Sequence, residues 1–252
     1  MVNLTYGMLD SIGRAIVTGE YDGRTFPTEA DLARAHGVSR SVTREAVKML
    51  TAKGLLSARP RQGTVVRPPA HWNLFDSDVL RWLLERQFSL DLLRQFNQLR
   101  VAIEPEAAAL AARFADQADM DEIAAGLAGM RAAGEGREDP LEADIAFHVA
   151  ILRAAKNPFY SQFRDMVGTA LRTSIRFTNR IDGRNTSIAD HAAVMHAIAA
   201  RDPEAARAAM RALINDVLDL IDTHEGAVRA ADPQPFPPRE AGEVAAKLTE
   251  GA

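Results

Sequence analysis

Residues 27–67 constrain the fold more than any other part of this chain. Thr28 can cap a helix through its hydroxyl, and Ser39 can cap a second helix after a short turn. Gly54 then supplies the left-handed residue at which helices commonly end. Two β-prone runs follow, with a turn over Pro60–Gly63 between them. The segment therefore predicts a short helix, a turn, a second helix and a small β-hairpin.

The composition limits the classes of protein to which this chain can belong. With 252 residues, 47% of them hydrophobic, it can form two modest domains that each have a core. There is no cysteine, which excludes disulfides, thiol nucleophiles and thiolate metal sites. No apolar run reaches the ~18 residues that a membrane span needs, and the N-terminus lacks the apolar region of a signal peptide. We therefore expect a soluble, cytoplasmic protein with no membrane partner.

The charge is distributed unevenly along the chain. The net charge is −4, yet residues 1–70 contain ten Lys/Arg against six Asp/Glu and so carry +4. The rest of the chain carries −8. Such asymmetry is expected when one part of a protein meets phosphate and the other does not.

Helical periodicity and breaker residues divide the chain into four parts. We expect an N-terminal domain over 1–68, a linker over 69–75, an all-helical domain over 76–225 and a disordered tail over 226–252. The linker is rich in proline, and the tail combines four prolines with little apolar content. The expected helices after the linker are 76–86, 89–115, 119–133, 138–155, 158–180, 187–200 and 203–224.

The second helix of the N-terminal segment presents a polar face that suits duplex DNA. Arginine is the commonest partner of guanine in the major groove, and N-terminal residues of such a helix reach base edges. A glycine in the hairpin would let its backbone approach DNA closely. The bland alternative is a solvated polar face on a small helical domain. The candidate DNA-binding residues are Arg34, Ser39, Arg40, Ser41, Thr43, Arg44, Arg61 and Gly63.

The same segment resembles the winged helix-turn-helix of the GntR superfamily of transcriptional regulators. The matching runs are GRTFPTEADLA, VSRSVTREAV and RQGTVV. The sequence departs from the family pattern at Phe26, where leucine is usual, and at Gln62, where arginine is usual. The resemblance implies that Arg34, Arg40, Arg44 and Gly63 occupy DNA-contacting positions.

Asp144 and His148 are candidate metal ligands in the helical part of the chain. They are four residues apart, so both project from one helix face. His191, on a later helix, could supply a third ligand, whereas His196 lies about 140° further around that helix. A carboxylate and an imidazole are workable ligands for a divalent ion. The alternative is a hydrogen-bonded Asp–His pair without metal.

Residues 76–224 resemble the FCD domain of the FadR branch of this superfamily. The matching runs are LRVAIEPEAAALAA, DIAFHVAILRAAKNPF and DHAAVMHAIAARDPEAARAAM. The resemblance implies one divalent ion (Zn, Ni or Mn) held by Asp144, His148 and His191. The third histidine of metal-binding members is replaced by Leu213, so water or effector oxygens would complete the shell. Alternatively, the metal is lost and the same polar groups bind the effector directly.

Two arginines indicate an anionic effector. Arg100 and Arg172 could both point into the bundle, and a buried guanidinium requires an anion. Arg100 could instead pair with Glu104 one turn away, Arg172 could lie on the surface, and Arg176 could take its role. The expected effector-binding residues are Arg100, Asp144, His148, Arg172 and His191.

A narrower resemblance concerns the run HWNLFDSDVLRWLLE over residues 71–85. It is similar to the corresponding run of the galactonate-operon group of sugar-acid repressors. The resemblance implies that Trp72 and Trp82 pack at the junction between the domains. It also implies that the effector is an aldonic or related sugar acid.

Together these features predict a mainly α protein, with an N-terminal winged helix-turn-helix followed by an all-α antiparallel bundle. We expect a homodimeric repressor that binds a palindromic operator in double-stranded DNA and is released by a small carboxylate. It is not expected to be an enzyme, because no general base, phosphate loop or nucleophile motif accompanies the Asp/His set. The alternatives are a metal-dependent hydrolase using Asp144, His148 and His191, and an architectural DNA-binding protein that responds to no effector.

Overall fold

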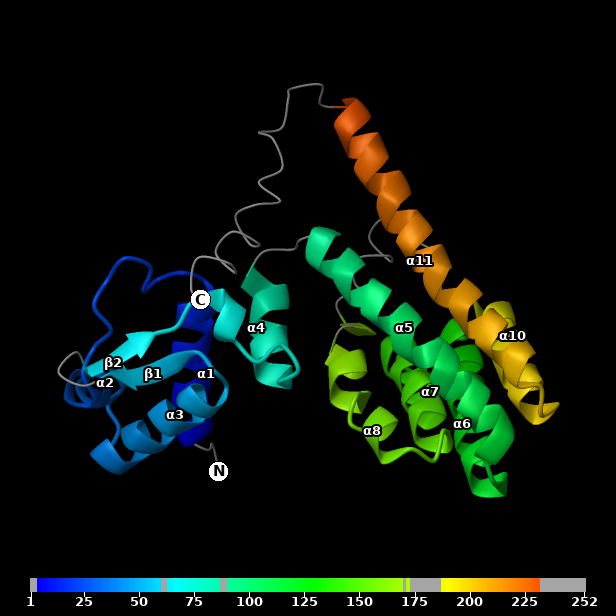
Figure 1. Cartoon of the computed structure of the whole chain (residues 1–252), viewed down its shortest axis with the longest axis horizontal. Helices are drawn as coiled ribbons and strands as arrows, with labels where there is room; N and C mark the ends of the chain where they lie inside the picture. Colours follow the sequence, from blue (N-terminus) through cyan, green and yellow to red (C-terminus); the bar gives the residue numbers. More distant parts are fainter. Residues whose placement is uncertain (1–3, 60–62, 87–89, 170, 173–186, 232–252) are drawn as a thin grey trace. The chain divides into compact units, whose positions relative to one another are not determined.

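A computed structural model describes residues 4–59, 63–86, 90–169, 171–172 and 187–231 of the protein. The chain forms two compact units that divide after residue 88. We call them the N-terminal unit and the C-terminal unit. Figure 1 draws the former in blue to blue-green and the latter in green to orange.

The N-terminal unit combines helices with one β-hairpin. Its elements are α1 (Leu4–Val17), α2 (Glu29–His36), α3 (Arg40–Ala52), β1 (Leu56–Arg59), β2 (Gly63–Val66), the short 3-10 helix η1 (Pro69–His71) and α4 (Ser77–Arg86). The Thr28 side chain caps α2 by accepting from the Asp31 amide, and Ser39 caps α3 by accepting from the Val42 amide. Gly54 follows α3 with a φ of 81°. These local signals were all predicted from the sequence.

The hairpin pairs β1 with β2 in an antiparallel register. Leu56 is opposite Val66, and Arg59 is opposite Gly63. Leu56 points into the unit and is fully buried, whereas the residues toward the turn are exposed. The described part of the hairpin therefore anchors one end in the core and carries the other end outward, as a wing does.

Helix α4 packs against α1 within the N-terminal unit. Trp82 is fully buried, and a Cβ added to Gly13 of α1 would come within 2.2 Å of its ring. Trp72 lies in the same core. The sequence placed residues 76–86 in the helical domain, whereas α4 packs within the N-terminal unit and both tryptophans belong to the core of that unit. An amphipathic pattern shows which face of a helix is apolar but not which unit that face covers.

The described regular elements of the C-terminal unit are all helical, as predicted. They are α5 (Leu90–Phe114), α6 (Gln117–Gly134), α7 (Pro140–Ala154), α8 (Pro158–Ser161), α10 (Ile188–Ala199), α11 (Pro203–Ala231) and the helical residues 164–169 and 171–172. Helix α5 packs against α7 and α11, α6 packs against α7, and α10 contacts α5, α6 and α11 (Figure 1).

Two helix boundaries in this unit differ from the prediction. The helix expected over 158–180 is interrupted after α8, where the amides of Gln162 and Phe163 bond to carbonyls three residues back and tighten the turn. Residues 173–180 lie outside the described residues. Helix α11 continues to Ala231, beyond residue 224, where the sequence predicted its end. The rest of the predicted tail lies outside the described residues.

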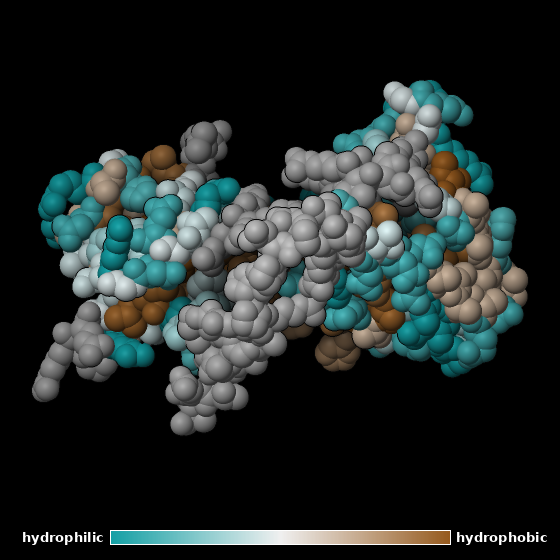
Figure 2. All heavy atoms as spheres, turned by 90° about the horizontal axis from the view of Figure 1, so that it is seen from above, coloured by the Kyte–Doolittle hydropathy of each residue, from teal (hydrophilic) through white to brown (hydrophobic). Residues whose placement is uncertain are grey.

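On the face drawn in Figure 2, hydrophilic residues lie around separate apolar areas wherever described residues are visible. Among the described helices, none combines the length and the hydropathy required to cross a bilayer.

Candidate functional site

The exposed side of α3 and the adjoining end of α2 form a basic surface. Arg40, Ser41 and Arg44 are exposed on the first turns of α3. The side chains of Arg34 and Arg44 are 79% and 65% exposed. Arg34 contacts Asp31 at 3.3 Å and Arg44 contacts Glu29 at 3.4 Å. Exposed ion pairs of this kind are weak, so both guanidinium groups are available to another anion.

One residue of the predicted DNA-binding set lies on the opposite side of α3. Thr43 is fully buried, and its hydroxyl donates to the Ser39 carbonyl at 3.1 Å. It shares an inward stripe with Ala46, Val47 and Leu50 at helical spacing. The expectation that Thr43 is exposed beside Arg44 is therefore wrong.

Three predicted DNA-binding positions remain: two are described by the structure and one lies outside the described residues. Ser39 is exposed, with its hydroxyl used by the cap of α3. Gly63 has a φ of 77° and open space around the position of a Cβ. Arg61 lies outside the described residues. The basic surface therefore consists of Arg34, Ser39, Arg40, Ser41 and Arg44, while Gly63 is the first residue of β2 in the hairpin.

In the C-terminal unit, α7 and α10 bring three potential ligands together. Asp144 and His148 lie one turn apart on α7, and His191 comes from the first turn of α10. All three are 1–2% exposed. Asp144 Oδ1 lies 3.0 Å from His191 Nε2 and 4.0 Å from His148 Nε2. The predicted set is thus assembled in one buried place.

The ring orientations leave both Nε2 atoms directed at Asp144. His191 Nδ1 lies 2.8 Å from the Ser187 carbonyl, to which it can only donate. His148 Nδ1 lies 2.5 Å from Glu104 Oε2. Burial alone would raise the pKa of Glu104, but Arg100 and His148 outweigh it and lower this pKa to about 2. Glu104 is therefore an anionic acceptor for the Nδ1 proton of His148.

Two buried atoms at this site have no hydrogen-bond partner among the described residues: Asp144 Oδ1 and His191 Nε2. They face each other at 3.0 Å. When His191 carries only its Nδ1 proton, its Nε2 presents a lone pair toward the carboxylate of Asp144, whereas a second proton on Nε2 would form an ion pair with Asp144. Buried polar groups are rarely left without a partner, because burial removes their hydrogen bonds to water and nothing replaces them. A cation between them would satisfy both atoms.

The donor set fits a divalent metal ion. The three ligand atoms lie within 4.8 Å of one another and comprise two imidazole nitrogens and one carboxylate oxygen. Such a set suits Zn, Ni or Mn, and Zn binds each donor type at about 2.0–2.2 Å. Leu213 is buried on α11 and offers no donor atom. A protein that holds a metal with three ligands leaves coordination positions for water or a small molecule.

Known proteins that are similar in sequence show to which family this chain, with its basic surface and its buried Asp/His cluster, belongs. The family model described as "Bacterial regulatory proteins, gntR family" matches residues 8–66, and the FCD domain model matches residues 95–216. The Escherichia coli K12 galactonate operon transcriptional repressor is 32% identical over 84% of this chain and 94% of its own length. The HTH-type transcriptional regulator YieP of the same organism is 34% identical over 84% and 93%. The chain belongs to the GntR family of bacterial transcriptional regulators.

A solved structure supports the fold of this GntR regulator. Lar of Listeria monocytogenes has a TM-score of 0.59 at 20% identity, over 88% of this chain and 98% of that one. The match to the gntR model falls in the N-terminal unit and the match to the FCD model falls in the C-terminal unit. This GntR regulator is therefore a DNA-binding transcription factor and not an enzyme.

Arg100 reaches the buried site of this GntR regulator from α5. It is 2% exposed, and its Nε donates to Glu104 Oε1 at 2.6 Å. Its Nη1 donates to Asn97 Oδ1 at 3.1 Å, and its Nη2 lies 3.4 Å from each ring nitrogen of His148. The ion pair with Glu104 that the sequence left open is therefore present, and Nη2 is directed at His148.

Arg172 does not join this site. It is exposed and pairs with Glu142 at the start of α7. The sequence left open that Arg172 lies on the surface, and this is where the structure places it. Arg176 lies outside the described residues. Asn97 and Ser187 were not foreseen from the sequence. Glu104 was foreseen only as a partner of Arg100, although its one-turn spacing signalled a shared helix face.

We expect Arg40→Ala and Arg44→Ala each to weaken sequence-specific binding by about 1–3 kcal/mol, the value of a good contact to a base. The measurement is a fluorescence-anisotropy titration with a duplex that the wild-type protein selects from a random-sequence pool. Arg24→Ala is the matched control, since Arg24 is exposed on the same unit and lies outside the basic surface. Equal affinities for all three variants would contradict the assignment of α3 as the reading helix.

Proposed function

We propose that this regulator is a homodimeric repressor of an operon for a carbohydrate-derived acid. Two N-terminal units would each read one half of a palindrome through α3, with the hairpin beside it. Such two-fold symmetry is the usual arrangement when a helix-turn-helix protein binds an operator. The comparison with the galactonate operon repressor supports the class of operon.

The effector is a 2-hydroxycarboxylate, of which sugar acids such as galactonate are examples. It would bind at Asp144, His148 and His191 together with one divalent ion of Zn, Ni or Mn. The observation that carries this proposal is the pair of buried atoms, Asp144 Oδ1 and His191 Nε2, that face each other at 3.0 Å and have no hydrogen-bond partner among the described residues. A bound ion would supply open coordination positions to a carboxylate oxygen and a neighbouring hydroxyl oxygen.

The surrounding residues would select and orient the anion. Arg100 Nη2 lies beside His148 and can donate to a carboxylate, for which a guanidinium is well suited. Glu104 holds the Nδ1 proton of His148 and so keeps Nε2 directed at Asp144. Leu213, in place of the family's third histidine, leaves a coordination position to the effector. Arg172 is not part of this proposed set.

Release from DNA requires that the effector bind two arrangements of the dimer with different affinities. A ligand with equal affinity for both would shift nothing, however tightly it bound. The effector would therefore favour an arrangement in which the two recognition helices no longer match the spacing of the operator half-sites.

A thermal-shift screen with sugar acids tests the effector class. At 100 times its dissociation constant, a ligand stabilises the folded state by about 2.7 kcal/mol. We expect such a shift with an aldonate in the presence of Zn²⁺, Ni²⁺ or Mn²⁺, a smaller shift with its 2-deoxy analogue, and none after EDTA. Equal shifts with both acids, unaffected by EDTA, would contradict chelation at the three ligands.

A further inference from the structure

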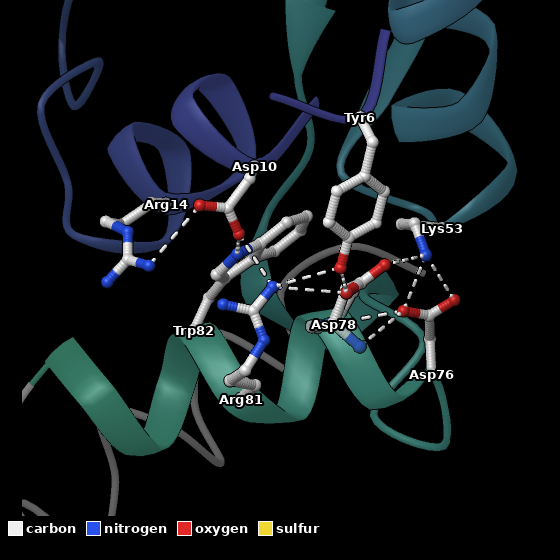
Figure 3. A network of polar contacts seen from close by, with 9 residues as sticks. Tyr6, Asp10, Arg14, Lys53, Asp76, Asp78, Arg81 and Trp82 are labelled. Atoms are coloured by element: carbon white, nitrogen blue, oxygen red, sulfur yellow. Dashed lines mark hydrogen bonds and ion pairs between the residues drawn. The ribbon is translucent and has the colours of Figure 1, made fainter. Parts of the chain in front are cut away.

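The start of α4 is bound to Lys53, the residue that caps the C-terminal end of the recognition helix α3. Asp76 lies just before α4, and its Oδ1 accepts from the amides of Asp78 and Val79, so that it caps the helix. The same carboxylate accepts from Lys53 Nζ at 2.7 and 2.8 Å. Lys53 is the C-terminal cap residue of α3. One carboxylate thus starts α4 and holds the end of α3 (Figure 3).

A second carboxylate extends this contact to α1. Asp78 Oδ2 accepts from Lys53 Nζ at 2.9 Å, while its Oδ1 accepts from the Tyr6 hydroxyl at 2.6 Å. Arg81 Nη2 donates to Asp10 Oδ1 at 2.6 Å and to Asp78 Oδ1 at 3.2 Å. Figure 3 shows these side chains converging from α1, α3 and α4.

Close packing leaves little freedom at the same junction. The Trp82 indole donates to Asp10 at 2.8 Å and lies against Gly13, where a Cβ would collide with its ring. A Cβ on Gly54, after α3, would come within 2.2 Å of the His71 carbonyl oxygen. The Asn73 amide also donates to the Lys53 carbonyl at 3.0 Å. The chain that precedes α4 is therefore held on the end of α3.

These contacts hold the Lys53 ammonium group against the carboxylates of Asp76 and Asp78. Its side chain is 13% exposed, and three carboxylate oxygens surround its ammonium group. Burial would lower the pKa of Lys53, but Asp76 and Asp78 outweigh it and raise this pKa, so the group is charged. A lysine enclosed in this way orients a helix and does not contact a phosphate.

We infer that α4 is part of the DNA-reading unit, and that Lys53, Asp76 and Asp78 are positioning residues for the recognition helix. The inference rests on the proposal that α3 enters the groove. The match to the family's DNA-binding model ends at residue 66, before α4 begins. The network fixes the C-terminal end of α3. It thereby orients the whole helix within the N-terminal unit, including the basic turns at its N-terminal end. The chain leaves this unit through α4, so the same contacts join the reading helix to the segment that leads to the C-terminal unit.

Asp76→Asn in the full-length protein tests the inference. Asparagine retains the helix cap but not the ion pair with Lys53. Removing an acidic group from a DNA-binding head tightens binding if only charge matters, whereas loss of positioning weakens it. We expect the affinity for a duplex selected by the wild type to fall about tenfold, the size typical of changes in a coupling network. Affinity for a scrambled duplex should be unchanged or higher.

Two further variants separate positioning from direct contact. Lys53→Met should weaken selected binding without changing the salt slope, because losing a phosphate contact lowers that slope by about one. Lys53→Arg should largely restore wild-type binding. Asp22→Asn is the charge control, since Asp22 is exposed on the same unit and outside the network.

Several outcomes would overturn the inference. One is tighter binding of the selected duplex by Asp76→Asn, and another is a lower salt slope for Lys53→Met. A third is that a variant loses binding to both the selected and the scrambled duplex and also loses the native tryptophan emission, which would indicate unfolding. If the wild-type protein selects no duplex, the proposal that α3 reads DNA is contradicted before any variant is measured. The inference rests on that proposal and would then be wrong as well.

Discussion

Zn²⁺ added to the metal-free wild-type protein should raise its melting temperature, and His191→Ala should abolish that rise. His191 supplies one of three ligand atoms, and its Nε2 has no hydrogen-bond partner among the described residues. Removing even an outer partner of a metal ligand costs about 10–100-fold in affinity, so losing a ligand should cost more. The affinity is measured by competition with a chelating dye, and the shift is measured by scanning fluorimetry.

His196→Ala is the matched control for this experiment. His196 lies on the same helix α10, is exposed and is not part of the ligand cluster. Its variant should bind Zn²⁺ as the wild type does. Equal Zn²⁺ shifts in the wild type and both variants would show that the ion binds elsewhere, and the proposed metal site would be wrong.

Trp82→Ala should destabilise the N-terminal unit by about 3–5 kcal/mol, as is typical when a fully buried aromatic residue is truncated. The variant loses the contact with Gly13 and the hydrogen bond to Asp10. The protein contains two tryptophans. Trp72 therefore remains as the only tryptophan reporter in the variant, and it lies in the same core. Urea unfolding followed by Trp72 fluorescence measures the change.

Phe159→Ala provides the comparison for a surface aromatic residue. Phe159 is 78% exposed, so its truncation should change stability by less than about 0.5 kcal/mol. Trp82→Ala should also leave Zn²⁺ binding intact, because the ligands belong to the other unit. Similar effects of the two variants on unfolding would contradict the packing of α4 against α1.

The DNA-binding head was predictable because its signals are local. The caps at Thr28 and Ser39 and the stop at Gly54 act within one turn of their own helix, so each can be recognised from neighbouring residues. Thr43 was misplaced because a threonine is compatible with either face of a helix. The place of α4 was also missed, since its partner Gly13 is far away in sequence and has no side chain to signal the contact.

The buried site was predictable in part for a similar reason. Asp144 and His148 share a helix face by spacing alone. His191 comes from another helix, so the residues alone made it only a possible third ligand, and the family resemblance then implied the full set. The orientation of both rings depends on Glu104 and Ser187, whose contacts form only after the helices pack. No spacing rule could therefore supply the two facing atoms, Asp144 Oδ1 and His191 Nε2, that carry the functional proposal.

The most direct test follows a DNA complex while sugar acids are added. The full-length protein is bound to its selected duplex, and anisotropy is recorded during titration with a panel of aldonates, with Zn²⁺ and then with EDTA. Allosteric coupling is typically worth about 5–150-fold in affinity. We predict that an aldonate weakens DNA binding within that range in the presence of Zn²⁺, and that EDTA removes the effect. If no acid changes the DNA affinity, either with Zn²⁺ or after EDTA, the account of an effector-controlled repressor is contradicted.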